Sequence, residues 1–114
     1  GDRIDLTTAN LTVAANNVAA VAGTSAAISA TGLATFAAAD NTLALKLTAL
    51  AAAGTGLVAN RAAVFVDGAD SYLWIDNGTA TIDGAFTDIL IKLTGVQATT
   101  GISINASGDI SAIA

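Results

Sequence analysis

The sequence predicts a mainly β fold: a sandwich or roll-like stack of short strands, with one α-helix, about residues 40–53, packed against it. Three observations predict this class. Residues 61 to 95 alternate β-branched and aromatic side chains between turn sequences, residues 40 to 53 show helical spacing of leucine, and the rest is rich in Ala, Thr and Gly. A length of 114 residues fits one domain with one core.

The strand pattern is clearest from residue 62 onward. Residues 62–67 and 70–76 alternate with a period of two, and large apolar side chains fall on both faces, so both faces of these strands are expected to be covered. The loop 67–70, DGAD, predicts an antiparallel hairpin. Residues 88–93 predict another strand with Ile89, Ile91 and Leu93 inward, and residues 101–114 offer two more short strands.

The N-terminal part has a weaker pattern. Residues 1–10 alternate Ile4 and Leu6 with charged residues, which suits a short strand with one apolar face. Residues 11–39 consist of small-residue stretches that we interpret as short strands or turns. Disorder of residues 9–39 is the alternative, although the Val, Ile and Leu scattered there favour order.

One helix is expected at residues 40–53. Asp40 is the expected N-cap, a leucine stripe lies on one face, and two glycines provide the stop. The stripe and the stop consist of Leu43, Leu47, Leu50, Gly54 and Gly56. We expect the stripe to pack against a sheet. Any boundary between subregions is expected near residues 54–60, where the Ala-rich sequence gives way to β-branched and aromatic residues.

Composition argues against several classes of function. The chain has neither Cys nor His, which removes Ser-His and Cys-His pairs, thiolate metal sites and the side chain that titrates near neutrality. Nine acidic residues, all Asp, face only four basic ones, so nucleic acid is not an expected partner. The best apolar run, residues 43–53, is short and interrupted by Lys46, so no transmembrane segment is expected.

Aspartates beside Gly and Asn raise the question of a calcium site. Asp67, Asp70, Asp76 and Asp83 occupy turn sequences, and calcium binds oxygen ligands in such loops. The favoured alternative is that these residues form turns, because Asp side chains bond to nearby backbone. No pattern sets two carboxylates across a cleft, so an enzyme is not expected. Trp74 and Tyr72 alternate with apolar residues, so burial is expected instead of ligand stacking.

Three phrases of the sequence carry a resemblance to a family. They are residues 1–6 (GDRIDL), residues 64–76 (VFVDGADSYLWID) and residues 88–95 (DILIKLTG). In order and spacing they resemble phrases in the C-terminal region of RTX proteins of the serralysin type and of S-layer proteins exported by type I secretion. One departure is that the family's G-D-T-Y reads ADSY at residues 69–72. The positions that carry the later two phrases are Phe65, Tyr72, Trp74, Asp76, Asp88, Lys92, Leu93 and Gly95.

The resemblance implies a non-catalytic C-terminal export signal and capping domain of a secreted or cell-surface protein. Residues 1–114 would then be a single domain cut from a larger protein, which the opening Gly1 also suggests. The implied partners are an ABC-type exporter complex and a preceding β-roll or repeat domain. The implied cofactor is calcium, bound by Asp2 and Asp5 in preference to Asp67 and Asp70. The alternative is an S-layer or self-assembly module, calcium-dependent in one version, whose exposed strands pair with neighbours.

Overall fold

The structure is a computed structural model that describes residues 11–56, 58, 60–76 and 88–114. Its centre is a four-stranded sheet in the order β1-β4-β5-β6. The strands are β1 (Thr12–Val13), β4 (Arg61–Asp67), β5 (Asp70–Asp76) and β6 (Ile89–Leu93). β1 runs parallel to β4, whereas β4, β5 and β6 are antiparallel to one another. The expected fold class, mainly β with one helix, is confirmed.

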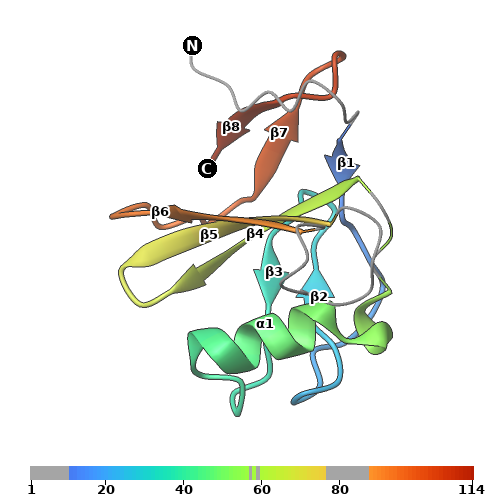
Figure 1. The fold of residues 1–114 in the computed structure, drawn as a ribbon, viewed down its shortest axis with the longest axis vertical. Helices are drawn as coiled ribbons and strands as arrows, with labels where there is room; N and C mark the ends of the chain where they lie inside the picture. The colour runs from blue at the N-terminus through green and yellow to red at the C-terminus, as the bar shows by residue number, and fades with distance from the viewer. Residues whose placement is uncertain (1–10, 57, 59, 77–87) are drawn as a thin grey trace.

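Two smaller layers cover the central sheet, as Figure 1 shows. On one side lies a hairpin of β7 (Ile102–Ile104) and β8 (Ile110–Ile113). On the other side lie a pair of two-residue strands, β2 (Ala27–Ile28) and β3 (Ala34–Thr35), and the helix α1 (Leu43–Ala51) with its following 3-10 turn η1 (Ala53–Thr55). The stack therefore has apolar side chains on both faces of its middle layer, as the alternation in β4 and β5 predicted.

Each face of the sheet has its own core. The hairpin-side core consists of the buried residues Leu11, Ala62, Val64, Leu73, Ile75, Ala98, Ile102 and Ile110. The helix-side core consists of Ala14, Ala26, Ile28, Ala34, Leu50, Ala63, Phe65 and Trp74. Successive residues of β4 and β5 alternate between the two because side chains in a strand alternate between the two faces of the sheet. As expected, Ile89, Ile91 and Leu93 of β6 pack against the hairpin-side core.

The helix is shorter than expected, and its N-cap differs. Thr42, not Asp40, is the N-cap, and its hydroxyl accepts the N–H of Leu45 at 3.2 Å. Asp40 is 3 % exposed, and both of its carboxylate oxygens accept the N–H of Gly23 at 3.1 Å. The carboxylate of Asp40 therefore binds the backbone of a loop 17 residues earlier. Thr42 instead accepts a hydrogen bond from a free N–H group at the start of the helix. The leucine stripe does pack as expected, with Leu50 fully buried.

The N-terminal part of the described chain is ordered. β1 adds to the edge of β4 with Thr12 opposite Arg61, and the chain at Leu33 forms a parallel bridge with Val64. The side chain of Asn16 binds the backbone at Ala26, Ile28 and Thr55, which fixes the small strands to η1. The strand expected at residues 1–10 lies outside the described residues, whereas residues 11–39 form short strands and turns, as interpreted from the sequence.

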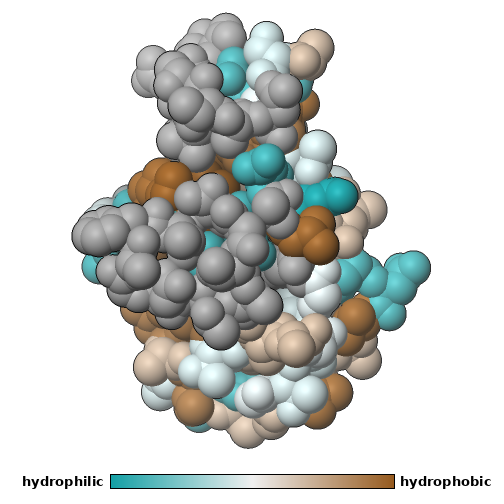
Figure 2. All heavy atoms as spheres, turned by 45° about the vertical axis from the view of Figure 1, so that its right-hand side comes forward, coloured by the Kyte–Doolittle hydropathy of each residue, from teal (hydrophilic) through white to brown (hydrophobic). Residues whose placement is uncertain are grey.

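Small residues make up much of the described surface. In Figure 2 pale and tan atoms, typical of Gly, Ser, Thr and Ala, cover much of the lower part, and brown patches are scattered. The exposed large apolar side chains are Val18, Val21, Leu45, Val58, Leu90 and Val96. No helix in the part of the chain that the structure describes is long and apolar enough to cross a membrane.

Candidate functional site

The two later phrases of the resemblance come together in the central sheet. Residues 64–76 form the β4–β5 hairpin, and residues 88–95 form β6 and the turn that follows it. Tyr72 lies opposite Lys92 in the register, and Trp74 lies opposite Leu90. The first phrase, residues 1–6, lies outside the described residues. The candidate site is therefore the sheet β4-β5-β6 and the tip of its hairpin.

The aromatic residues of these phrases belong to the core. Phe65 stacks on Tyr72 with ring centroids 5.5 Å apart, and Phe36 meets Phe65 edge-on at 5.4 Å. Trp74 is 1 % exposed. The burial expected for Trp74 is confirmed, and Tyr72 is half-buried. These rings stabilise the helix-side core and form no open stacking platform.

The helix holds one side of the hairpin tip. Lys46 extends from α1 and donates to the carbonyl oxygen of Val66 and to the carboxylate of Asp67, at 2.9 Å in each case. The Lys46 side chain is 16 % exposed and that of Asp67 is 26 % exposed. The ammonium thus binds the backbone near the end of β4 as well as a side chain in the hairpin turn. A lysine that interrupts the apolar helix sequence therefore ties the helix to the sheet.

The strand β6 and its turn hold the other side of the tip. Asp70 accepts the N–H of Gly95 at 2.8 Å and pairs with the ammonium of Lys92 at 3.2 Å. The hydrogen bond from Gly95, with Lys92 adding to it, holds the pKa of Asp70 below its ordinary value. Asp70 in turn raises the pKa of Lys92. Asp70, Lys92 and Gly95 thus form a clamp, called here the tip clamp, and all three lie within the phrases of the resemblance.

Two further polar side chains tie the segment after β6 to the hairpin. The hydroxyl of Ser71 is buried; it donates to the carbonyl of Val96 at 2.7 Å and accepts the N–H of Ala98 at 2.9 Å. Gln97 donates to the carbonyl of Gly68 in the hairpin turn at 3.0 Å. Neither role could be assigned from the sequence, because each joins segments more than 20 residues apart.

The aspartates expected to bind calcium have the following positions. Asp2 and Asp5 lie outside the described residues, as does Asp83. Asp67 and Asp70 face each other across the hairpin turn, and each pairs with a lysine. The described residues contain no cluster of three or more potential metal-ligating acids. The ion pairs give Asp67 and Asp70 a structural role, and calcium binding at any of these positions stays a prediction.

The other two acids of the phrases mark strand ends. Asp76 is the last residue of β5 and is 1 % exposed, and its backbone carbonyl accepts the N–H of Asn60 at 2.7 Å. Asp88 directly precedes β6 and is half-buried. They flank the loop between β5 and β6 and do not converge with the tip clamp in the described register.

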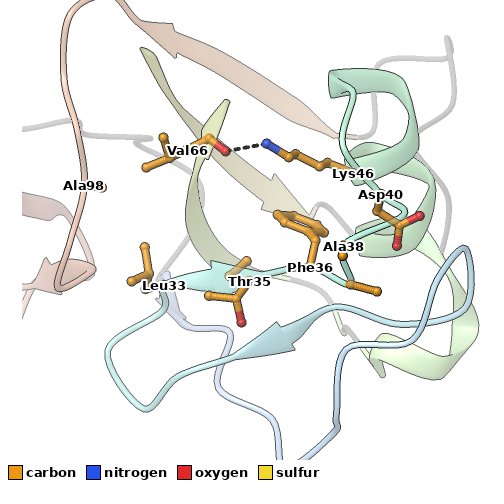
Figure 3. Close-up of a pocket in the computed structure, with 10 residues that line it drawn as sticks. Leu33, Thr35, Phe36, Ala38, Asp40, Lys46, Val66 and Ala98 are labelled. Carbon is orange, nitrogen blue, oxygen red and sulfur yellow. Dashed lines mark hydrogen bonds between the residues drawn. The ribbon is translucent and has the colours of Figure 1, made fainter. Parts of the chain in front are cut away.

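A groove of about 400 Å³ lies beside the hairpin tip. Figure 3 shows Leu33, Thr35 and Phe36 along one wall and Val66 with Lys46 across from them. Most of the lining is apolar, and its two charged members are Lys46 and Asp40. Both charges already have protein partners, Lys46 at Val66 and Asp67, and Asp40 at Gly23. The groove therefore presents small apolar side chains and no converging acid–base pair.

Comparison of the chain with protein-family models, with curated proteins and with solved structures finds no match. The resemblance to type I secreted proteins therefore stays a prediction from the three phrases. The arrangement of the phrases in one sheet is independent of that comparison, because it follows from the strand register.

Proposed function

We propose that this chain is a non-catalytic C-terminal export and capping module of a secreted or cell-surface protein, delivered by a type I exporter. The observation that carries the proposal is the tip clamp. Asp70, Lys92 and Gly95 resemble positions of the family phrases, and all three hold the fold together. Residues that hold a turn to a hairpin in this way suit a folded recognition module better than a reaction centre.

The surroundings of the clamp support a chemically inert role. The aromatic residues are core residues, and the charged residues beside the groove are bound to backbone or to each other. Catalysis needs groups that are positioned on a substrate, often with pKa values shifted toward neutrality. Here Asp70 is shifted further into its charged form and Lys92 likewise. Both shifts favour the charged forms of the two residues.

The position of β1 supports the capping part of the proposal. β1 joins the sheet as a two-residue parallel strand at its edge, and the N–H of Leu11 binds the carbonyl of Gly108 at 3.2 Å. A very short edge strand limits further pairing, which is how natural sheets protect their ends.

Calcium belongs to the same proposal through Asp2 and Asp5. Closely spaced carboxylates repel one another until a divalent cation neutralises them, so their folding would depend on calcium outside the cell. This dependence would keep the chain unfolded where calcium is scarce and fold it after export.

The decisive experiment fuses the chain to an unrelated, slow-folding passenger in cells with and without a type I exporter. The proposal expects the passenger in the medium only when the exporter is present. Passenger retained in both strains would refute it. Removal of the residues from Asp109 onward is a poor test of an address in the tail, because Ile110 is 2 % exposed in the hairpin-side core and its loss would disturb folding.

A matched pair of substitutions tests whether the exporter recognises the C-terminal strand independently of folding. Ala112 is exposed on β8, and Ala44 is exposed on α1, so Ala112→Lys and Ala44→Lys make a matched pair. Both variants should keep the fluorescence of buried Trp74 and the wild-type melting temperature. If the C-terminal strand is the part that the exporter reads, Ala112→Lys lowers secretion and Ala44→Lys does not. Equal secretion of the two variants would mean that the exporter recognises a part of the fold other than β8.

A further inference from the structure

The outer edge of β6 carries backbone groups that pair with no other described strand. In the described residues β6 pairs with β5 alone. The N–H of Val64 in β4 donates to the carbonyl of Gly32, so the backbone groups of Val64 point away from β5. Leu73 of β5 lies opposite Val64, so its own N–H and C=O groups point away from β4 and toward β6. Ile91 lies opposite Leu73 and faces β5. By alternation, the N–H and C=O groups of Leu90 and Lys92 point outward.

The edge is apolar for an exposed strand. β6 has the sequence ILIKL, and Leu90 is 39 % exposed on the same face of the sheet as Trp74. Exposed edges with β-branched and leucine side chains are templates for pairing with another strand. The ends of the strand carry opposite charges, with Asp88 just before it and Lys92 within it.

The spacing of these residues is self-complementary. If two copies pair antiparallel about a two-fold axis at Leu90, each Leu90 faces its counterpart. Ile89 then faces Ile91, and Asp88 faces Lys92 of the second copy. The backbone groups of residues 88, 90 and 92 all point outward from the sheet edge. In this register they lie opposite the same set of residues in the second copy, so they can form hydrogen-bonded pairs. If the register shifted by one residue, side chains from opposite faces of the sheet would lie opposite each other, and the pairing of Asp88 with Lys92 would be lost.

We infer that β6 pairs edge to edge with β6 of a second copy of this chain, antiparallel and with Leu90 opposite Leu90. The pairing joins two four-stranded sheets into one of eight strands. This inference goes beyond export and capping and does not depend on them. It supplies a surface for contact between copies of the chain.

Lys92 has a selective role in this pairing. Lysines on edge strands commonly prevent unwanted association. In the register with Leu90 opposite Leu90, Lys92 lies opposite Asp88 of the second copy. Its side chain is 53 % exposed while it binds Asp70, so the ammonium is accessible to a second carboxylate. Asp88 is half-buried and retains its contacts within the chain, so the cross-strand attraction adds to them.

The association should be weak in dilute solution. An edge of five residues is far smaller than a standard protein interface, and the chain carries a net charge of −5, which makes copies repel each other. Added salt screens this net repulsion, and it also weakens the Asp88–Lys92 attractions. Dense packing of copies on a surface would raise their effective concentration and favour the dimer.

A charge-exchange experiment tests the register. Asp88→Lys places Lys opposite Lys92 at both ends of the homodimer, and Lys92→Asp places Asp opposite Asp88 at both ends. Each variant alone should dimerise about tenfold more weakly than wild type, because like charges directly opposite are destabilising. An equimolar mixture of the two restores complementary pairs, so it should associate at the wild-type level. Sedimentation velocity on the full chain measures each case, and Trp74 fluorescence checks folding.

A second pair of variants covers the case in which a charge variant fails to fold. Leu90→Lys sets Lys against Lys on the two-fold axis, and Val18→Lys changes a side chain of similar exposure, 37 %, away from this edge. The pairing predicts dimer loss for Leu90→Lys alone. Wild-type chain that remains monomeric at its highest soluble concentration would overturn the inference. So would a mixture of charge variants no stronger than its components, or equal effects of Leu90→Lys and Val18→Lys.

Discussion

The hydroxyl of Thr55 is the clearest single test of how the helix is attached to the sheet. Thr55 is fully buried at the end of η1. Its Oγ1 donates to the carbonyl of Ala49 in α1 at 2.6 Å and accepts the N–H of Ala26, beside β2, at 2.9 Å. One atom therefore joins the helix to the small strands. Thr55→Val keeps the branched shape and removes both hydrogen bonds.

The cost follows from what is left unpaired. Ala26 is fully buried, so its N–H loses its acceptor and has no access to water. The carbonyl of Ala49 still accepts the N–H of Ala52 at 3.3 Å, so its loss is smaller. An orphaned buried donor costs about 1–3 kcal/mol, and we expect Thr55→Val to lower the free energy of unfolding by about 2 kcal/mol.

Urea unfolding followed by the fluorescence of Trp74, the chain's one tryptophan, measures this difference. Thr48→Val is the matched control. Thr48 is exposed on α1, and its hydroxyl binds the carbonyl of Ala44 at 2.9 Å within the same helix. Its change should stay within about 0.5 kcal/mol. A loss at Thr55 no greater than that at Thr48 would refute the reasoning.

Three other predictions concern the tip clamp, two glycines and the calcium hypothesis. The tip clamp stabilises the fold through ionised Asp70, whose pKa is lowered in the folded state, so this stabilisation is present above the ordinary aspartate pKa and is lost as pH falls through the lowered pKa. Asp70→Asn should remove it, so the acid-unfolding curves of variant and wild type should converge at low pH. Parallel curves over the whole pH range would contradict this. Gly101→Ala should destabilise by more than about 1 kcal/mol, because a Cβ there would overlap the backbone of Thr31 at a positive φ. Gly68→Ala, with positive φ and open space, should cost less in the same urea assay. Asp2→Asn combined with Asp5→Asn should abolish any calcium-induced rise in melting temperature, and a rise that survives both changes would exclude these ligands.

The sequence was sufficient to predict the strands that carry a strong period. Alternation in residues 62–67 and 70–76 determines which side chains enter each core, because a strand with large apolar residues on both faces must be covered on both. The turn at residues 67–70 and the two C-terminal strands follow from local turn chemistry. These features depend on neighbours in sequence, so they are accessible without tertiary information.

The contacts of single polar side chains could not be predicted in the same way. Asp40 looked like a helix cap, yet it binds the N–H of Gly23, and Thr42 caps the helix instead. Both residues suit the capping position by type, so only the approach of a distant loop decides between them. Lys46 looked like an interruption of an apolar run, although its ammonium joins Val66 and Asp67 to the helix.

The Ala-rich region illustrates another limit. Ala26, Ile28 and Ala34 belong to the helix-side core, but alanine gives little periodic signal and little burial energy per residue. Their positions depend on hydrogen bonds from Asn16 and Thr55 to separate segments. Such bonds have no signature in local composition, which is why the order of this region was left open by the sequence.

The placement of Ala98, Ile102 and Ile110 determines when this protein can fold. These residues close the hairpin-side core over Val64 and Leu73, and they lie near the C-terminal end of the sequence. A ribosome-bound chain that lacks them leaves one face of the central sheet exposed to water, so hydrophobic collapse is incomplete until residue 110 has been synthesised. Delayed maturation of this kind gives chaperones and proteases time to act on the nascent polypeptide before its native state forms.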